Sequence, residues 1–71
     1  MYEITKGCFI KSKDTEKQFE VVDITPNHIR LKDSFTEQEI ELTVDEVNEQ
    51  IFLGNYDIGT FDVREKKIKF S

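Results

Sequence analysis

The alternation of apolar and polar residues is the clearest pattern in the chain, and it is sharpest on either side of the polar segment 33–38. Residues 28–32 and 39–42 each place apolar side chains on one face and charged side chains on the other. An antiparallel pairing of the two stretches satisfies both faces in one register, because a slip of one residue would bury the charges. The predicted cross-strand pairs are Leu31 with Ile40, Ile29 with Leu42, Arg30 with Glu41, and Lys32 with Glu39.

The N-terminal part of the chain predicts two more strands, each with a break in its alternation. Lys6-Gly7 interrupts the first strand, where a bulge or bend is expected. The second strand covers residues 18–24, and its apolar phase flips between Val21 and Val22, as in strands that turn the corner of a small barrel. Pro26 then lies in a turn. The apolar positions of the first strand are Tyr2, Ile4, Cys8 and Ile10.

A short helix is predicted over about residues 44–52. Thr43 and Glu46 match a capping box, in which the side chain at the N-cap accepts the backbone N–H three residues on. Gly54 suits the position at which a helix ends in a left-handed turn. The apolar stripe expected to face the core consists of Val44, Val47 and Ile51.

The C-terminal part predicts two strands joined by the polar loop 64–67. The longer strand shifts its apolar phase at Gly59-Thr60. The shorter strand carries Ile68 and Phe70, which are expected to pair back as core positions and so to dock the C-terminal end. The apolar positions of the longer strand are Tyr56, Ile58, Phe61 and Val63.

The order of the expected elements is four strands, one helix and two strands. We therefore predict a mainly β fold, between all-β and small α+β. It would be a compact five- to six-stranded antiparallel, barrel-like sheet with one short helix at about 44–52. In the number and order of its elements the chain is similar to SH3-like barrels, and a compact α+β fold is the alternative. Its 71 residues are expected to form a single small domain, 1–71.

Few residues suit catalysis or metal binding. Cys8 is the only cysteine and His28 the only histidine, so neither an internal disulfide nor a cysteine–histidine metal site is expected. Cys8 is predicted to be a buried apolar residue and His28 a surface residue. A domain of this size is also not expected to form a typical cleft of several hundred Å³. We therefore predict no catalytic residue, no cofactor, no metal and no enzymatic activity.

Acidic residues are concentrated in the middle of the chain. The formal net charge is −5, and residues 33–63 contain nine acidic residues but no lysine or arginine. Part of this acidity has a local explanation, because Glu39 and Glu41 face cations. Asp45 and Glu46 lie at the start of the helix, where negative charge is favourable. The acidity is either a solubilising surface or a face that docks onto a basic protein.

The favoured function is a non-catalytic protein-interaction module that uses an acidic surface to bind another protein with a basic surface. Phe35 stands in a polar loop, and it either folds over the core or is exposed as an anchor for the partner. The lack of alanine and the many Ile, Lys, Glu and Asn residues suggest an AT-rich coding sequence, which adds the hypothesis of a phage or mobile-element accessory or regulatory factor. The candidate partner-contact residues are Phe35, Asp45, Glu46 and Glu49.

Two alternatives stay open. A small SH3-like barrel could bind nucleic acid directly through a basic patch, although the net negative charge opposes contact with phosphate. A structural subunit without a ligand is the other. The residues of the basic patch are Lys11, Lys13, Arg64, Lys66, Lys67 and Lys69.

The chain shows no sign of a membrane segment or a secretion signal. The N-terminal residues lack the apolar stretch of a signal peptide, and the apolar runs are too short to cross a membrane. The single thiol suits a reducing compartment. We therefore predict a cytoplasmic protein without membrane contact, and make no prediction of its oligomeric state.

Overall fold

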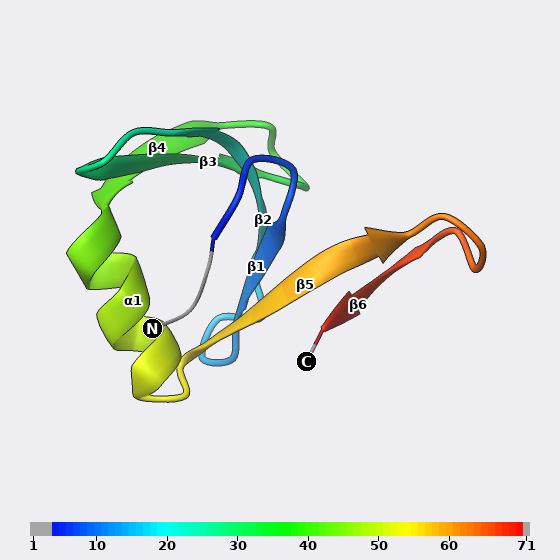
Figure 1. The fold of residues 1–71 in the computed structure, drawn as a ribbon. Helices are drawn as coiled ribbons and strands as arrows, with labels where there is room; N and C mark the ends of the chain where they lie inside the picture. Colours follow the sequence, from blue (N-terminus) through cyan, green and yellow to red (C-terminus); the bar gives the residue numbers. More distant parts are fainter. Residues whose placement is uncertain (1–3, 71) are drawn as a thin grey trace.

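The computed structural model describes residues 4–70, which form six strands and one helix (Figure 1). In chain order these are β1 (Phe9–Ser12), β2 (Gln18–Ile24), β3 (His28–Asp33), β4 (Glu39–Thr43), α1 (Val44–Phe52), β5 (Tyr56–Asp62) and β6 (Lys67–Phe70). The predicted mainly β fold and the predicted order of strands and helix are both confirmed.

The strands form one antiparallel sheet in the order β4-β3-β2-β1-β5-β6. β4 and β6 are its two edges, and within residues 4–70 no pairing joins them, so the closure expected of a barrel is not observed. The sheet curves around α1, which contacts β4 and β5, and the β5–β6 hairpin extends away from this body (Figure 1). The core lies between α1 and the concave face of the sheet. Its buried apolar side chains are Cys8, Ile10, Val21, Ile29, Leu31, Val47 and Ile51.

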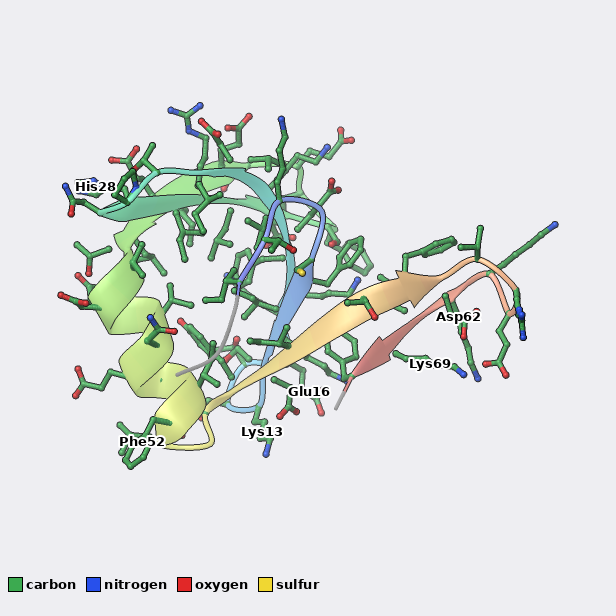
Figure 2. All side chains as sticks on the ribbon, viewed as in Figure 1. Lys13, Glu16, His28, Phe52, Asp62 and Lys69 are labelled. Atoms are coloured by element: carbon green, nitrogen blue, oxygen red, sulfur yellow. The ribbon has the colours of Figure 1, made fainter. Side chains whose placement is uncertain are left out.

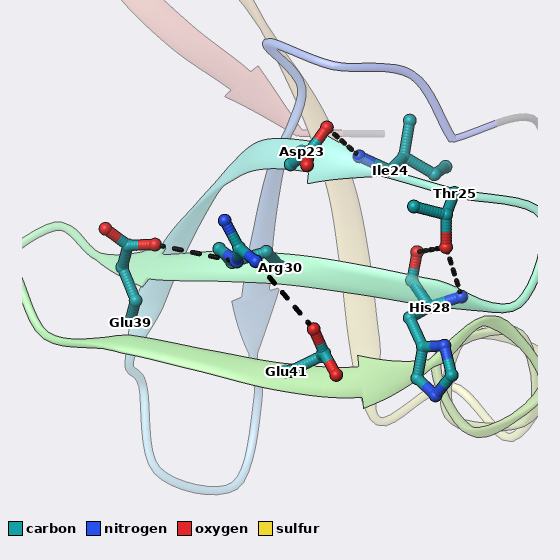
Figure 3. Close-up of polar contacts among 7 residues, drawn as sticks. All are labelled: Asp23, Ile24, Thr25, His28, Arg30, Glu39 and Glu41. Carbon is teal, nitrogen blue, oxygen red and sulfur yellow. Dashed lines mark hydrogen bonds and ion pairs between the residues drawn. The ribbon is translucent and has the colours of Figure 1, made fainter.

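The register predicted for the β3–β4 hairpin is confirmed at all four pairs. The charged face differs in one respect, because Arg30 contacts both acidic residues (Figure 3). Its Nε lies 3.8 Å from Oε1 of Glu39, and its Nη2 lies 4.0 Å from Oε2 of Glu41. Lys32 and Glu39 face each other across the strands as predicted, but the Glu39 carboxylate lies against Arg30.

The breaks predicted in the first two strands are also present. The pairing of β2 with β3 shifts between Val21 and Asp23, which places a bulge at the predicted change of phase. Gly7 has a φ of 95°, and the turn at this residue delays β1 until Phe9. Ile4 packs against the core from outside any strand. The predicted first-strand residue Tyr2 lies outside the described residues.

Both ends of α1 follow the predicted caps. The Glu46 N–H donates to Oγ1 of Thr43 over 3.1 Å. At the other end Gly54 has a φ of 82°. The N–H of Gly54 donates to the Ile51 carbonyl over 3.0 Å, and the N–H of the following residue, Asn55, reaches back to the last turn of the helix. This pair of bonds is the Schellman motif, which ends the helix at the predicted position.

Three hairpins of the chain share one loop geometry that the sequence analysis did not anticipate. In each, a side chain at the end of the first strand accepts backbone N–H groups of the loop, and the fourth loop residue has a positive φ. Asp33 Oδ1 accepts from Phe35 and Thr36 at 2.7 and 3.1 Å, Asp62 Oδ1 from Arg64 and Glu65 at 2.8 and 3.1 Å, and Ser12 Oγ from Thr15 at 3.4 Å. The positive φ angles are 60° at Glu16, 63° at Glu37 and 55° at Lys66.

Tyr56 and Ile58 of β5 pack against the core, but the apolar residues beyond Gly59 do not, so the predicted core positions Ile68 and Phe70 are wrong. Ile58 pairs with Ile10 on the core face, and β5 continues through Gly59 without the expected change of phase. Phe61 and its partner Ile68 therefore lie on the opposite, convex face. Phe70 also lies on that face, across from Gly59, and Val63, predicted as a residue of the longer strand, is an exposed loop residue.

Candidate functional site

The four residues singled out by the sequence lie at two separate places. Phe35 is in the loop between β3 and β4, whereas Asp45, Glu46 and Glu49 lie on α1. The whole length of β4 separates the loop from the helix, because the loop precedes this strand and α1 follows it. The structure therefore does not bring the four residues together into one site.

Phe35 is fully displayed on an ordered loop. Its side chain is 97% exposed, so the alternative in which it covers the core is wrong. The Asp33 carboxylate beneath it is buried and accepts the Phe35 N–H. The N–H groups of Thr36 and Phe35, which bind the charged form, lower the pKa of Asp33 below its usual value. The loop thus holds Phe35 in solvent.

The surface has open grooves of several hundred Å³, contrary to the expectation that a domain of this size forms no such cleft, and two of them lie near the loops of β1–β2 and β3–β4. One, of about 620 Å³, lies beside Phe35 and combines Lys11 and Lys17 with Glu16 and Asp33. The other, of about 560 Å³, lies between the β1–β2 loop and the C-terminal end of α1. Both are open to solvent, and the charges that line the first are balanced in sign.

The three acidic residues of α1 lie on the side of the helix that faces away from the sheet. Val47 and Ile51 are buried, and at 100° per residue Glu49 points opposite to them. The same side continues into two exposed apolar residues at the end of α1, Phe52 and Leu53, which are 82% and 59% exposed. Figure 2 shows Phe52 pointing away from the body of the molecule. We call Asp45, Glu46, Glu49, Phe52 and Leu53 the outer helix face.

The carboxylates of the outer helix face have no ion-pair partner among residues 4–70. Asp45 and Glu46 have a local role, because they lie in the first turn of α1 near its positive end. Glu49 lies beyond that turn and has no such role. Five acidic residues elsewhere are paired: Glu39 and Glu41 with Arg30, Asp57 with Lys13, and Asp62 and Glu65 with Lys69. Others, such as Glu37, also have no ion pair among the described residues.

Half of the basic patch considered for nucleic acid is neutralised by carboxylates. Lys69 Nζ lies 3.1 Å from Asp62 Oδ2 and 3.0 Å from Glu65 Oε2 (Asp62 and Lys69 are labelled in Figure 2). Lys67 Nζ lies 3.3 Å from the same Glu65 oxygen. The Glu65 N–H and the Lys69 ammonium, together with the Arg64 N–H, lower the pKa of Asp62. Its carboxylate therefore remains charged and keeps this pairing at neutral pH.

The rest of that patch is divided between the body and the tip of the hairpin. Lys13 pairs with Asp57 over 3.5 Å, and Lys11 Nζ lies 5.8 Å from the centre of the Phe70 ring. Arg64 and Lys66 are exposed at the hairpin tip, and neither has an ion pair within the described part of the chain. Within this patch, the residues with neither an ion pair nor a ring contact among the described residues are thus Arg64 and Lys66 at the tip.

The sequence analysis missed the exposed apolar residues beside these charges. Of the six phenylalanines only Phe19 packs against the core formed by the described residues. Phe52 follows Glu49 by three residues, so helical spacing alone would have placed it on the outer side of α1. The exposure of Phe52 was not recognised because Phe52 belongs to the apolar run Ile51-Phe52-Leu53, in which only Ile51 is buried.

The two residue types most often used in catalysis have structural positions here. Cys8 is buried in the core, with Sγ 3.1 Å from Oγ1 of Thr5. His28 is exposed at the start of β3, beside the Thr25 turn (Figure 3). Across residues 4–70, no three or more His, Cys, Asp or Glu side chains form a group that could hold a metal ion. The helix found in these residues is too short and too polar to cross a membrane.

The outer helix face and the hairpin tip are therefore two surfaces with exposed apolar side chains beside unpaired charges of opposite sign, and the β3–β4 loop, with Phe35 and the exposed Glu37, is a third surface of this kind. Comparison with known proteins assigns none of them, since no protein-family model, curated protein or solved structure matches the chain.

Proposed function

We propose that this chain is a non-catalytic protein-interaction module whose outer helix face binds a protein with a basic surface. The observation that supports this most is the position of Glu49. It is exposed and has no ion pair among the described residues, and it lies next to Phe52 and Leu53 on the side of α1 opposite the core. Acidic and apolar groups are thus combined on one helix, as in helices that present one face to a partner.

The two parts of this face contribute differently to binding. The carboxylates attract a basic partner over a distance and favour its correct orientation. Burial of Phe52 and Leu53 supplies affinity, at about 1.5–3 kcal/mol for each fully buried side chain. Phe35 lies beyond β4, so in this proposal it forms a separate contact or none.

The most direct test uses a defined basic probe and two variants with the same change of charge. A short fluorescein-labelled peptide of alternating lysine and leucine is titrated with the protein, and its anisotropy is measured. Glu49→Lys should weaken binding about tenfold. Glu37→Lys is the matched control, because Glu37 is exposed on the β3–β4 loop with no ion pair among the described residues. Equal weakening by both variants would mean that net charge alone attracts the peptide, and would contradict the site.

Asp45 and Glu46 are poor choices for charge reversal. Lysine in the first turn of α1 opposes the helix dipole and costs about 0.3–1 kcal/mol per residue. A loss of binding could then reflect a frayed helix. Glu49 lies outside this turn, so its reversal tests the surface without this effect.

Direct binding of nucleic acid is the alternative, and the same assay separates it. A labelled oligonucleotide is used in place of the peptide. The double variant Arg64→Glu, Lys66→Glu, called the tip variant, is used in place of Glu49→Lys. We expect little oligonucleotide binding, because Lys13, Lys67 and Lys69 are paired with carboxylates. Tight binding that is lost in the tip variant would favour the nucleic-acid function over the protein-binding one.

A further inference from the structure

We infer that the tip of the β5–β6 hairpin of a second copy of this chain is itself a ligand for the outer helix face, so that copies associate head to tail. This inference rests on the proposed function, because it names a partner for the same face. It joins two exposed surfaces that combine apolar side chains with unpaired charges of opposite sign.

The hairpin is poorly supported by its own chain. β1 accompanies β5 only as far as Gly59, and among residues 4–70 β6 pairs with β5 alone. We call residues 60–69, beyond the end of β1, the arm. A two-stranded ribbon of this kind is only marginally stable in water. Its apolar side chains are nevertheless displayed, with Phe61 51% and Val63 78% exposed. The arm would gain stability from a surface that covers them.

The arm and the outer helix face are complementary in charge and in apolar character. Arg64 and Lys66 project from the tip without ion pairs in the described residues, next to the exposed Val63. The outer helix face offers Glu49 with no ion pair, beside the exposed Phe52. A contact between the two would pair cations with carboxylates and remove apolar surface from water on both sides.

The position of the arm means that this contact forms between two copies and not within one. The arm extends away from α1, so its tip lies remote from the helix of its own chain (Figure 1). Because the two surfaces differ, each contact joins the arm of one copy to the helix of another, and repeated contacts give a reciprocal pair, a ring or an open chain of copies. Pairing of two β6 edges is disfavoured instead, since Lys67 and Lys69 would face the lysines of the other strand.

Sedimentation velocity over a concentration series tests the association. We expect the average mass to rise between about 10 µM and about 1 mM at low salt, and to fall again at high salt. Two variants should each raise the dissociation constant about tenfold or more. The helix variant is Glu49→Lys, and the arm variant combines Arg64→Glu with Lys66→Glu. Glutamate suits position 66, because Glu37 and Glu16 occupy the same loop position with φ of 63° and 60°.

Mixing the two variants provides the decisive result. The helix variant keeps a basic arm and the arm variant keeps an acidic helix, so an equimolar mixture should form one-to-one pairs, a mass that neither variant reaches alone. Glu37→Lys, which makes the same charge change as the helix variant, should associate like the unmodified chain. A monomeric unmodified chain throughout the series, or a mixture that stays monomeric, would overturn the inference.

Failure of the inference and failure of the proposed function are distinguishable. One outcome is a monomeric chain that binds the lysine–leucine peptide and loses that binding only in Glu49→Lys. In that case the outer helix face is a docking site and the arm is not its ligand. If the peptide does not distinguish Glu49→Lys from Glu37→Lys, the proposed function fails, and any association must use another surface.

Discussion

The β3–β4 and β5–β6 hairpins are built from the same parts but have different environments. Both use a loop in which an aspartate carboxylate accepts two backbone N–H groups, and both have one apolar and one charged face. The apolar face of β3 lies under α1, where Ile29 and Leu31 are buried. The apolar face of β5–β6 lies on the convex side, where Phe61 is half exposed.

This difference shows that alternating apolar and polar residues predict a strand, but do not predict which other element packs against its apolar face. The β3–β4 hairpin is part of the folding core. The arm depends on its own cross-strand contacts, on the Phe70 ring over Gly59, and on a partner if one binds. We expect substitutions in the two hairpins to act on stability and on association separately.

The largest expected difference between the hairpins is in global stability. Leu31→Ala, at a side chain that is 1% exposed, should lower the free energy of unfolding by about 2–5 kcal/mol because it leaves a cavity in the core. Phe61→Ala in the arm should lower it by less than about 1 kcal/mol, as expected for a surface change. Urea denaturation followed by circular dichroism measures both. Equal losses would contradict the assignment of the arm to a region outside the core.

A second difference concerns the close approach of β6 to Gly59. A Cβ at this position would lie 2.6 Å from Cδ1 of Phe70 and 2.8 Å from the Lys69 carbonyl oxygen. Gly59→Ala should therefore displace β6 and cost about 1–3 kcal/mol, as overpacking does. Amide hydrogen exchange should show faster exchange in β6 while β3 stays protected. Thr60→Ala, at the exposed neighbour, is the control and should leave the exchange of β6 unchanged.

Acid should weaken both loops in the same way. The pKa values of Asp33 and Asp62 are lowered in the folded state, so in the range between folded and unfolded values the unfolded chain binds more protons. Their contribution to stability is present above the usual aspartate pKa of about 3.9 and is lost as the pH falls through the lowered values. The doubly substituted Asp33→Asn, Asp62→Asn chain keeps acceptor oxygens but cannot titrate. Its melting temperature should fall less steeply in acid than that of the unmodified chain, and an identical slope would contradict these pKa shifts.

The smallest effect is expected from the exposed ion pairs. Arg30→Met in the β3–β4 hairpin and Lys69→Met in the arm should each change the free energy of unfolding by about 0.2–1 kcal/mol, because solvent screens such pairs. Thermal melts at low and high salt measure the change. A loss of several kcal/mol for Lys69→Met alone would mean that ion pairs, rather than packing against Gly59, hold the arm.

Much of the fold was predictable because its signals are local. The β3–β4 register followed because the apolar face and the charged face require the same pairing. The bulge in β2 followed from the change of apolar phase between Val21 and Val22. The two ends of α1 followed from Thr43 and Gly54. The side on which β5–β6 displays its apolar residues was not predictable. Alternation in Phe61, Ile68 and Phe70 is the same whether the strand pair covers the core or projects from it.

The candidate site was predictable in part. The exposure of Asp45, Glu46 and Glu49 follows from the apolar stripe of α1, and the structure confirms it. Their role in binding stays a prediction. The exposure of Phe35 was left open by the sequence, because only the three-dimensional path of the loop shows that no core surface lies within its reach.

The measurement that tests the outer helix face most directly is a dilution series of two-dimensional amide NMR spectra on the labelled full chain. From about 10 µM to about 1 mM we expect resonances of Glu49 and Leu53 to shift together with those of Arg64 and Lys66, while loop 34–37 stays unchanged. Addition of the lysine–leucine peptide should shift the helix resonances alone. Shifts confined to loop 34–37, or helix resonances that respond to neither dilution nor peptide, would contradict the assignment of binding to this face.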